Sequence, residues 1–457
     1  MRIFHAADIH LGRRRLDGRL PDDDFKRAFD HIADQAIQKG ADVFLIAGDL
    51  FDRPAVEPPH LRQAQQVLAK LKEAGIPVVA TVGNHDKAFI SSDDPTWLDY
   101  LADDELLILL QTRFGPDGPH LEPWTRETRR GSWIDLQGVR FTGAGYLGAA
   151  TPLKFRQIVD HLDPDRVHGV LLHAGPDYFV GEGGGFSSDD LKAVKGRIAY
   201  LALGHIHKPM LHGGWACNPG SPENCELSES HYSFNKAGAP CPRGYAVVEL
   251  DPTVTPPLRG VEIRSNPRRP VAHLALDCGP FGNKLKDGAA ALESAACEWI
   301  ATNKLSPETA VVLRLSGKLH LGRIALDLQV AATNIQQAAG VAAVALDATA
   351  INLDDVAGGA SSADEGQTRE QIERSAIRQL VDEENLWGLD GAQEQIAALF
   401  YGLKEGVRLG RSPDELGEMI QTSAVVDGVA AAIQGASDSS RGDGPAGSGP
   451  VPEGGTP

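Results

Sequence analysis

Short apolar runs alternate with amphipathic stretches over the first 265 residues, which predicts an α/β fold of layered β-sheets flanked by helices. The predicted strands are residues 2–8, 41–49, 77–84, 139–146, 168–175 and 198–205. Residues 22–40 begin with acidic side chains, carry apolar ones at helical spacing and end at Gly40, so they predict a helix. Residues 60–75 predict a second helix that ends at Gly75.

The same alternation continues on a smaller scale after residue 265. The predicted strands are residues 269–277, 309–317 and 341–349, and the predicted helices are residues 289–302 and 324–339. Further along, residues 353–368 have the composition of a linker, residues 369–423 read as helices, and residues 436–457 are rich in Gly, Ser and Pro, typical of disorder. We therefore predict a main domain (1–265), a small α/β domain (268–352), a linker (353–368), a helical segment (369–423) and a disordered tail (436–457).

Composition narrows the class of protein. Hydrophobic residues make up 42% of the 457, enough for sizeable cores, yet no apolar stretch approaches the roughly 18 residues of a membrane span. The N-terminus runs straight into patterned sequence with no basic-then-apolar leader, so we expect a soluble cytoplasmic protein without membrane contact. The five cysteines are scattered and lack a CxxC pair, which argues against a disulfide framework and against a zinc-thiolate site.

The net charge of −18 bears on the partners of this chain. Binding to a phosphate backbone normally uses concentrated Lys and Arg, so an acidic chain is poorly suited to hold long DNA alone. Bound metal ions can supply local positive charge, and a partner subunit can supply the remaining basic surface. The charge therefore does not count against a phosphoester as substrate.

Metal-binding side chains follow five of the predicted strands. They are Asp8 and His10, then Asp49, then Asn84 and His85, then His173, and finally His205 and His207. Because ligands gather at the carboxyl ends of parallel strands, we expect these side chains to meet in one place. Imidazole, carboxylate and amide groups together form a nitrogen and oxygen ligand set, which suits Mn, Fe or Zn.

Each of these motifs also has an ordinary structural interpretation. An Asp-x-His triplet arises by chance in many proteins, and a single histidine at a strand end is more often a hydrogen-bonded structural residue. Glycines such as Gly48 and Gly204 permit tight exits from strands without any site. The combination of all five, in this order and each at a strand end, is what predicts a site.

In this order the motifs resemble those of the calcineurin-like metallophosphoesterases. They are DxH (8–10), GDLFD (48–52), GNHD (83–86), the strand-end His173 and GHIH (204–207). The residue sequences of these motifs, DIHLG, GDLFDRP, GNHDK and LGHIHKP, are similar to those of the SbcD-type DNA repair exonucleases, which partner an SMC-like ATPase. The stretch NPGSPE (218–223) also resembles the loop that closes the nuclease domain of this family.

The resemblance implies roles for the matching residues. One metal would be held by Asp8, His10 and His207, and the other by Asn84, His173 and His205. Asp49 would bridge the two, since a carboxylate offers two oxygens to two cations roughly 3.5–4 Å apart. The metals, Mn by resemblance with Fe or Zn as alternatives, would activate a water as nucleophile. His85 would stay off the metals and protonate the leaving oxygen, while Asp52 would orient His85 or hold a metal ligand.

Weaker patterns suggest contacts with DNA and with a partner. Arg13, Arg14 and Arg15 follow the first motif, where they would contact phosphate or form a solvated loop. Residues 175–188 would form a substrate rim with Tyr178 or Phe179 stacking on a base, or a plain connection. By resemblance the small domain would cap the nuclease domain, and the chain would form a homodimer.

The last pattern is an apolar stripe in the C-terminal helical segment. Its members follow helical spacing at Leu389, Ala392, Ile396, Leu399 and Leu403. The stripe either packs within the chain or receives a helix of an SbcC-like ATPase. Together the patterns favour a metal-dependent DNA exonuclease and endonuclease of DNA repair. Its rivals are a small-molecule phosphodiesterase or phosphatase of the same superfamily, and a non-catalytic scaffold that kept the fold.

Overall fold

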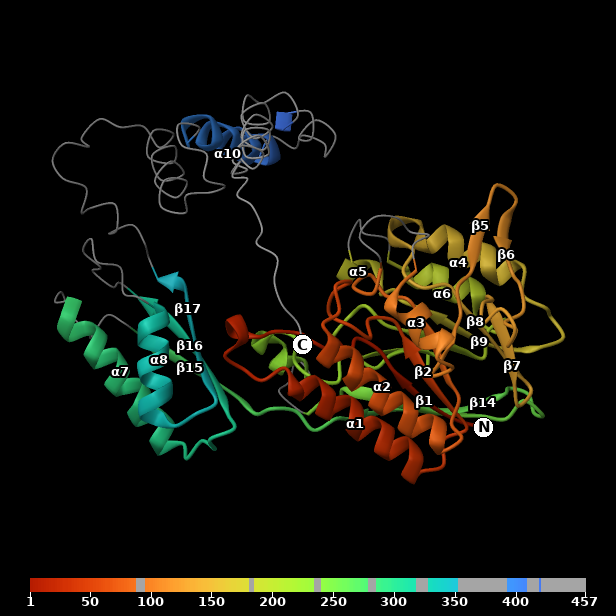
Figure 1. The fold of residues 1–457 in the computed structure, drawn as a ribbon, viewed down its shortest axis with the longest axis horizontal. Coiled ribbons are helices and arrows are strands. Elements are labelled where there is room, and N and C mark those ends of the chain that lie inside the picture. The colour runs from red at the N-terminus through yellow and green to blue at the C-terminus, as the bar shows by residue number, and fades with distance from the viewer. Residues whose placement is uncertain are drawn as a thin grey trace, which may run out of the picture. The chain divides into compact units, whose positions relative to one another are not determined.

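The computed structural model describes residues 1–87, 95–180, 185–233, 240–277, 285–317, 328–351, 393–408 and 419–420. It divides the chain into two compact units, Met1–Val356 and Ala357–Pro457 (Figure 1). The predicted linker and the predicted tail lie outside the described residues. In the described part of the chain, no helix has the length and apolar character that would let it cross a membrane.

The first sheet of unit Met1–Val356 has six strands in the order β14-β13-β1-β2-β3-β4. Strands β1 to β4 run parallel, whereas β13 and β14 join one edge in antiparallel pairs. The bounds are β1 (Arg2–Ala6), β2 (Val43–Ala47), β3 (Val78–Thr81), β4 (Ile108–Leu109), β13 (Gly244–Leu250) and β14 (Leu258–Ser265). The strands predicted over 2–8, 41–49 and 77–84 are therefore present, each ending before its polar motif.

The second sheet also has six strands, in the order β11-β12-β10-β9-β8-β7. Strands β8, β9, β10 and β12 run parallel, and β7 and β11 are antiparallel edges. The bounds are β7 (Trp133–Leu136), β8 (Val139–Gly143), β9 (Val167–Leu172), β10 (Tyr200–Leu203), β11 (Met210–His212) and β12 (Ala216–Asn218). The six predicted strands thus divide between two sheets. Hydrophobic periodicity alone does not show which strands share a sheet.

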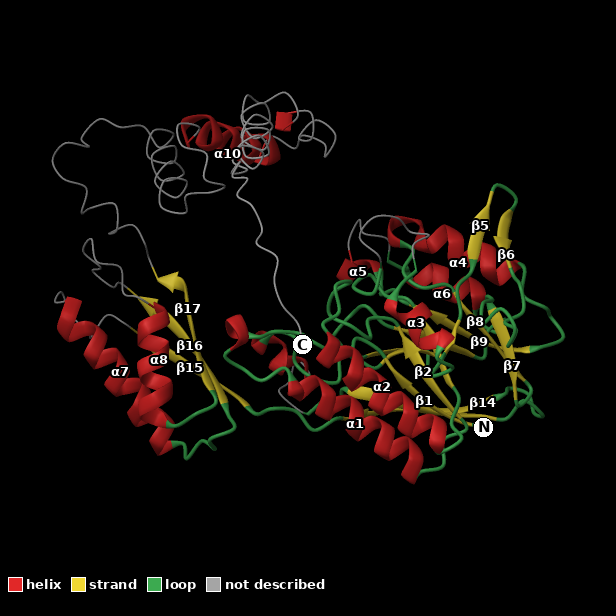
Figure 2. Ribbon diagram, viewed as in Figure 1, coloured by secondary structure: helices red, strands yellow, loops and turns green. Residues whose placement is uncertain are grey.

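Helices cover the outer face of each sheet, as Figure 2 shows by colour. The longer ones are α1 (Asp23–Gln38), α2 (Pro58–Glu73), α3 (Trp97–Asp103), α4 (Thr151–Asp160) and α6 (Ser188–Val194). Short elements complete the unit: α5 (Asp177–Val180), the hairpin β5 (Arg113–Gly115) and β6 (Gly118–His120), and the 3-10 turns η1 (Leu16–Gly18), η2 (Gly148–Ala150) and η4 (Leu227–Ser233).

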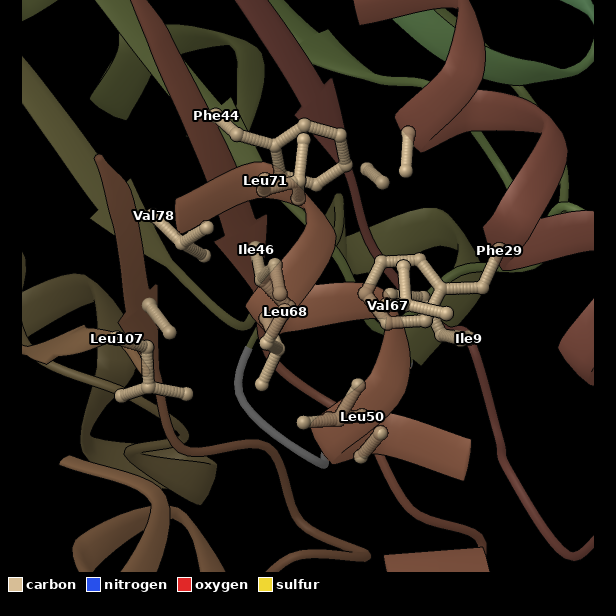
Figure 3. Close-up of a cluster of buried hydrophobic side chains, with 14 of the residues drawn as sticks. Ile9, Phe29, Phe44, Ile46, Leu50, Val67, Leu68, Leu71, Val78 and Leu107 are labelled. Atoms are coloured by element: carbon tan, nitrogen blue, oxygen red, sulfur yellow. The ribbon is translucent and has the colours of Figure 1, made fainter. Parts of the chain in front are cut away.

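Alternate residues of each central strand point to opposite faces and bury both. On β2, Phe44 and Ile46 pack with α1 and α2, alongside Phe29 and Leu68 (Figure 3). Their neighbour Leu45 instead packs between the two sheets with residues of β9 and β10. Burial on both faces is what makes parallel strands read as continuous apolar runs. The layers are therefore helix, sheet, sheet, helix, which confirms the predicted α/β architecture.

A third sheet follows β14 and has three parallel strands in the order β15-β16-β17. Its elements are β15 (Val271–Asp277), α7 (Leu285–Thr302), β16 (Ala310–Gly317), α8 (Leu328–Ala339) and β17 (Ala343–Ile351). One apolar core joins both helices to the strands. These elements match the predicted small domain, while its boundary with the first 265 residues stays a prediction because both fall in the same compact unit.

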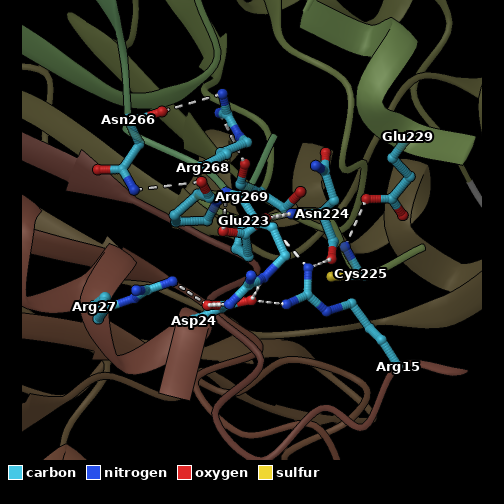
Figure 4. Close-up of polar contacts among 12 residues, drawn as sticks. Arg15, Asp24, Arg27, Glu223, Asn224, Cys225, Glu229, Asn266, Arg268 and Arg269 are labelled. Carbon is cyan, nitrogen blue, oxygen red and sulfur yellow. Dashed lines mark hydrogen bonds and ion pairs between the residues drawn. The ribbon is translucent and has the colours of Figure 1, made fainter. Parts of the chain in front are cut away.

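A buried ionic network fixes the segment between β14 and β15 (Figure 4). The carboxylate of Asp24 on α1 accepts from Arg15 and Arg27, and from Arg269 at 2.6 and 2.8 Å. The backbone N–H of Arg269 also donates to Glu223 at 3.2 Å. Since Asp24 is 2% exposed, these arginines compensate a carboxylate that would otherwise be buried without a counter-charge.

Unit Ala357–Pro457 is described over a small part. Helix α10 (Gln393–Arg408) covers the second half of the predicted apolar stripe. Within it Ile396 is buried, whereas Phe400 is 42% exposed. Leu389 and Ala392 lie outside the described residues, as do most of the helices predicted over 369–423.

Candidate metal centre

The predicted metal ligands lie in the loops that directly follow five strands from both sheets. Asp8 follows β1, Asp49 follows β2, and Asn84 follows β3 in the first sheet; His173 follows β9, and His205 follows β10 in the second. A contact between the two sheets joins these loops, since the backbone N–H of His205 donates to Oδ1 of Asp8 at 2.8 Å. The carboxyl ends of the two sheets therefore meet at one place.

Two glycines of these motifs are required by close approach. A Cβ at Gly83 would lie 2.0 Å from Oδ1 of Asp49, and a Cβ at Gly48 would lie 2.3 Å from Nδ1 of His173. Gly48 also has a φ of +87°, in the left-handed region that favours glycine. Any side chain at these two positions would displace a predicted ligand.

Several predicted ligands have a strained backbone. The φ angles are 54° at Asp8, 51° at His10, 53° at Asp49 and 80° at His205, all in the left-handed region. Such conformations are uncommon outside glycine and cost on the order of 1–3 kcal/mol each. The fold holds these four residues in sharp turns at the strand ends, and strain of this kind concentrates at functional sites.

One group of side chains consists of Asp8, His10 and His207. The Nε2 atoms of His10 and His207 face each other at 3.1 Å. Asp8 is fully buried, and while its Oδ1 accepts the backbone N–H of His205 at 2.8 Å, its Oδ2 has no hydrogen-bond partner. Two imidazole nitrogens face to face beside an unpartnered buried carboxylate oxygen is an arrangement that suits a cation.

A second group consists of Asn84, His173 and His205. The amide oxygen of Asn84 lies 3.0 Å from Nε2 of His173 and 2.9 Å from Nδ1 of His205. His173 is fully buried, and its Nδ1 donates to the carbonyl of Ala47 at 2.8 Å, which leaves Nε2 facing the group. These three atoms offer one oxygen and two nitrogens to a single point.

Asp49 stands between the two groups. Its Oδ2 lies 3.7 Å from Nε2 of His10 and 3.2 Å from Nε2 of His173, while its Oδ1 accepts the backbone N–H of His85 at 2.9 Å. Burial opposes its charged form, yet the neighbouring histidines, His173 above all, hold the pKa of this carboxyl well below its usual range. Asp49 is therefore a carboxylate that contacts both groups.

The two histidines of the second group differ in the charge they favour. Burial lowers the pKa of His173, but the charges of Asp49 and Asp8 outweigh it and raise that pKa to about 9. Burial and the neighbouring His173 lower the pKa of His205 to about 4. The second group therefore favours the protonated form of His173 and disfavours that of His205. The donors present fit divalent cations. The ligand atoms of Asp8, His10 and Asp49 lie within 4.8 Å of one another, as do those of His10, Asp52 and His85, so either group could hold a metal ion.

His85 is oriented by a backbone group. Its Nδ1 donates to the carbonyl of Asp52 at 2.7 Å, and its ring lies edge-on to that of His10 with centroids 4.8 Å apart. The carboxylate of Asp52 instead lies 3.4 Å from Nδ1 of His10 and accepts from Arg13 at 3.2 Å. The side-chain contacts of Asp52 therefore favour the alternative in which it holds a metal ligand rather than His85.

Asp86, the last residue of the GNHD motif, has a structural environment. Its carboxylate accepts the backbone N–H groups of Leu50, Phe51 and Gly83 at 3.3, 2.9 and 2.9 Å. Burial first, and then the charge of Asp49, raises its pKa to about 6. Asp86 ties the second motif to the third and so fixes the loops that carry Asp49 and Asn84.

The three consecutive arginines have three different environments. Arg14 is exposed and pairs with Glu57 at 2.8 Å, and Arg13 pairs with Asp52 and Glu226. Arg15 is 3% exposed and is bound to Asp24 and Glu223. The guanidinium of Arg15 is bound by buried carboxylates, which argues against a phosphate contact from this side chain. Arg13 and Arg14 remain candidates.

Several residues around the site were not predicted. Cys225 lies within 4.8 Å of His10 and His207, among atoms that could hold a metal, although the scattered cysteines indicated no such place. Lys208 lies 5.7 Å from the ring of Phe179 and 5.9 Å from that of Tyr232, and Lys87 lies 5.1 Å from that of Tyr146. Each lysine directly follows a metal-binding motif in the sequence, and this position alone would have placed it near the site.

Among the described residues, Cys217, Cys225, Cys241 and Cys297 are free thiols. Cys278 lies outside those residues. Of the proposed rim, Phe179 is 44% exposed on α5, while the side chain of Tyr178 lies outside the described atoms.

Comparison with known proteins places this geometry among relatives. The calcineurin-like phosphoesterase family model matches residues 1–209. The DNA double-strand break repair protein Mre11 of Archaeoglobus fulgidus is 31% identical over 253 residues, which are 50% of this chain and 52% of the relative. The protein of the same name from Aeropyrum pernix is 26% identical over 294 residues, 62% of this chain and 65% of the relative. The chain thus spans about half to two thirds of the length of these relatives.

A solved structure also aligns with part of the chain. The purple acid phosphatase from yellow lupin (Lupinus luteus) covers 48% of this chain and 43% of its own, at 17% identity and a TM-score of 0.28. A likeness this slight carries no argument about function.

Proposed function

Because residues 1–209 form a calcineurin-like phosphoesterase domain, we propose that this protein is a DNA nuclease that hydrolyses phosphodiester bonds with two divalent metal ions. The observation that carries the proposal is the position of Asp49, whose Oδ2 lies 3.7 Å from Nε2 of His10 and 3.2 Å from Nε2 of His173. A carboxylate between two nitrogen-rich groups is the arrangement that a two-metal site needs.

The ligands divide into two sets. Subsite 1 comprises Asp8, His10 and His207, subsite 2 comprises Asn84, His173 and His205, and Asp49 is shared. Bound metals would supply positive charge to the phosphate oxygens and lower the pKa of a water that attacks phosphorus. Nitrogen and oxygen donors suit Mn, Fe and Zn alike, and we assign Mn to both subsites because of the resemblance to the SbcD-type nucleases.

His85 is proposed as the proton donor to the leaving oxygen. The Asp52 carbonyl accepts from Nδ1 at 2.7 Å and so fixes the ring, which leaves Nε2 of the protonated imidazole to donate. His85 is half-buried, and its ring lies beside that of His10. Asp52 acts on the other side, through Nδ1 of His10.

DNA is the proposed substrate because of the relatives and the rim. The curated relatives are named as DNA double-strand break repair proteins. Lys87 and Lys208 each lie near an aromatic ring beside the ligand loops, and cations interleaved with aromatic rings suit a nucleic-acid strand. Arg14, which is exposed, would add a phosphate contact.

The test is hydrolysis by the full chain of blunt duplex, hairpin and single-stranded DNA, each with Mn, Mg or Zn. Bis(p-nitrophenyl) phosphate and a phosphopeptide serve as competing substrates. We expect Mn-dependent cleavage of DNA. Turnover confined to the small substrates would favour a small-molecule phosphodiesterase or phosphatase, which the net charge of −18 also favours. Two bound metals without hydrolysis of any substrate would indicate a scaffold.

The remaining parts of the chain are assigned by the same proposal. Residues 268–352 would cap the nuclease domain, and residues 369–423 would dock the coiled coil of an SbcC-like SMC ATPase whose basic surface compensates for the acidity of this chain. The chain would work as a homodimer in the cytoplasm. The exposed ring of Phe400 on α10, one turn after buried Ile396, supports a helix that presents an apolar face.

Docking can be tested without disturbing the metal centre. Deleting all residues after Ala357 should leave Mn-dependent cleavage of short DNA intact and abolish co-purification with the ATPase. Because Ile396 is buried within its unit, Phe400→Asp is the sharper point change, and Lys404→Glu on the same helix is a matched control. Loss of metals or unfolding on truncation would assign the helices to the core of this chain instead.

A further inference from the structure

His207 differs from His173 and His85 in what lies behind its ring. Its Nδ1 lies 2.6 Å from Oε1 of Glu229, on η4. His173 and His85 instead donate Nδ1 to backbone carbonyls, those of Ala47 and Asp52. A side-chain carboxylate is therefore the direct partner of His207, and it comes from a segment that carries none of the metal-binding motifs.

The carboxylate of Glu229 has a fixed orientation. The residue is 6% exposed, and its Oε2 accepts the backbone N–H of Cys225 at 2.9 Å. The fully buried guanidinium of Arg243 lies 3.7 Å from the same oxygen. Both oxygens are engaged by different groups, so the carboxylate cannot rotate without breaking one of these contacts.

The loop that precedes η4 is itself anchored at several points (Figure 4). The side chain of Glu223 accepts the backbone N–H of Asn224 at 2.7 Å and that of Arg269 at 3.2 Å. Arg243 donates to the side chain of Asn224 and, at 3.4 Å, to that of Ser221. Glu229 is thus presented to His207 by a segment held in place through buried ionic and polar contacts.

These contacts determine which nitrogen of His207 is available to a metal. A carboxylate only accepts, so Nδ1 carries a proton, and in the neutral imidazole the lone pair is then on Nε2. That Nε2 is the atom that faces Nε2 of His10 at 3.1 Å. We infer that Glu229 is the positioning residue for His207, fixing its tautomer and its ring so that Nε2 binds the metal of subsite 1. The inference rests on the proposed two-metal function.

Glu229 could alternatively serve only to hold the loop, through Cys225 and Arg243. The two roles differ in what they change. A positioning role weakens the binding of one metal and is overcome by excess metal. A purely structural role lowers the stability of the metal-free protein and is not specific to either subsite.

The experiment measures Mn binding to the full chain by calorimetry, with bound metal counted after dialysis. The variants are Glu229→Gln, which keeps an acceptor without the charge, and Glu229→Ala, which removes both. Glu262→Gln is the matched control, since Glu262 on β14 is exposed and pairs with Arg264. Thermal melting in chelator and the Mn concentration for half-maximal DNA cleavage are measured in parallel.

We expect the wild type and the control to bind two Mn ions. In Glu229→Ala, the affinity for one of the two should fall by about 10–100-fold, the usual effect of removing a partner behind a ligand, with a smaller fall in Glu229→Gln. Melting in chelator should be unchanged in Glu229→Gln, which keeps an acceptor for the Cys225 N–H, and lower in Glu229→Ala, which leaves the buried Arg243 without this carboxylate. Saturating Mn should restore cleavage in both variants.

Three results would overturn the inference: unchanged affinity for both ions in both variants, an equal loss at both subsites, or a loss in Glu229→Gln that follows a lower melting temperature of that variant. If Glu229→Ala does not fold, the nearly isosteric Glu229→Gln decides alone. A wild type that binds no metal would instead refute the proposed function, so the two failures are distinguishable.

Discussion

The two proposed subsites share Asp49 but are supported differently. Behind the histidines of subsite 1 stand two carboxylates, Glu229 at 2.6 Å from His207 and Asp52 at 3.4 Å from His10. Behind His173 in subsite 2 stands the neutral carbonyl of Ala47 at 2.8 Å. The ligands differ in the same sense, since subsite 1 has the carboxylate of Asp8 where subsite 2 has the amide of Asn84.

This difference bears on how the site fills. Affinity for a cation rises with the negative charge that surrounds it, and partners behind the ligands raise the basicity of the imidazoles. Subsite 1 should therefore bind its metal more tightly and fill first, while subsite 2 should exchange more readily. The predictions below break or sharpen this asymmetry.

The largest effect is expected from removing the shared ligand. Asp49→Ala takes away a carboxylate within contact distance of histidines from both subsites, so both metal affinities should fall and cleavage should drop to background. Metal analysis after dialysis and a cleavage assay measure the two losses, and circular dichroism checks that the fold survives. Two ions retained at full occupancy would contradict the bridging assignment.

A large effect on turnover alone is expected at His85. His85→Leu should leave both metal affinities unchanged and lower kcat by about 10²-fold, the scale of a lost general acid. Calorimetry with Mn and steady-state cleavage measure the two quantities separately. If a metal is lost instead, His85 is a ligand and belongs to a subsite.

The asymmetry itself can be reduced at Asn84. Asn84→Asp places a carboxylate in subsite 2, so the affinity for the more weakly bound Mn should rise by about 10-fold through the added charge. Two-step calorimetric titration should then show the two affinities approaching each other. A gain in the tighter step, or no gain in either, would mean that ligand charge does not set the order of filling.

The smallest effect is expected outside both subsites. Arg14→Gln removes an exposed guanidinium near the loop of subsite 1 and should weaken DNA binding a few-fold, with the salt dependence reduced by about one unit. Fluorescence anisotropy over a range of salt measures this. Arg62→Gln, on α2, serves as a control of equal charge change. An altered metal affinity in Arg14→Gln would show that the arginine acts on the metal centre rather than on DNA.

The sequence predicted the parts of the site that lie at strand ends. Asp8, Asp49 and His173 each follow a buried apolar run, and a polar side chain directly after such a run lies at the sheet edge where ligands gather. The division of the strands into two sheets was not predictable, because Phe44 and Leu45 are equally apolar although they bury against different layers. A strand buried on both faces gives no alternation from which its neighbours can be inferred.

Residues in η4 and in the loop before it escaped prediction for another reason. Glu229 and Cys225 lie in a segment without helical or strand periodicity, and their position near His207 depends on contacts with residues distant in the chain. The burial of Arg15 likewise depends on Asp24 and Glu223, the second of which is 208 residues away. Such pairings are tertiary and leave no local pattern.

The left-handed turns at Asp8, His10, Asp49 and His205 have a consequence for evolution under heat. Each lowers the stability of the fold by on the order of 1–3 kcal/mol, and two of them bury a carboxylate as well. Glycine or asparagine there would relieve the backbone while destroying the ligand set. A laboratory selection for heat resistance alone should therefore enrich inactive variants at these positions, whereas a selection carried out in the presence of metal should retain the native residues.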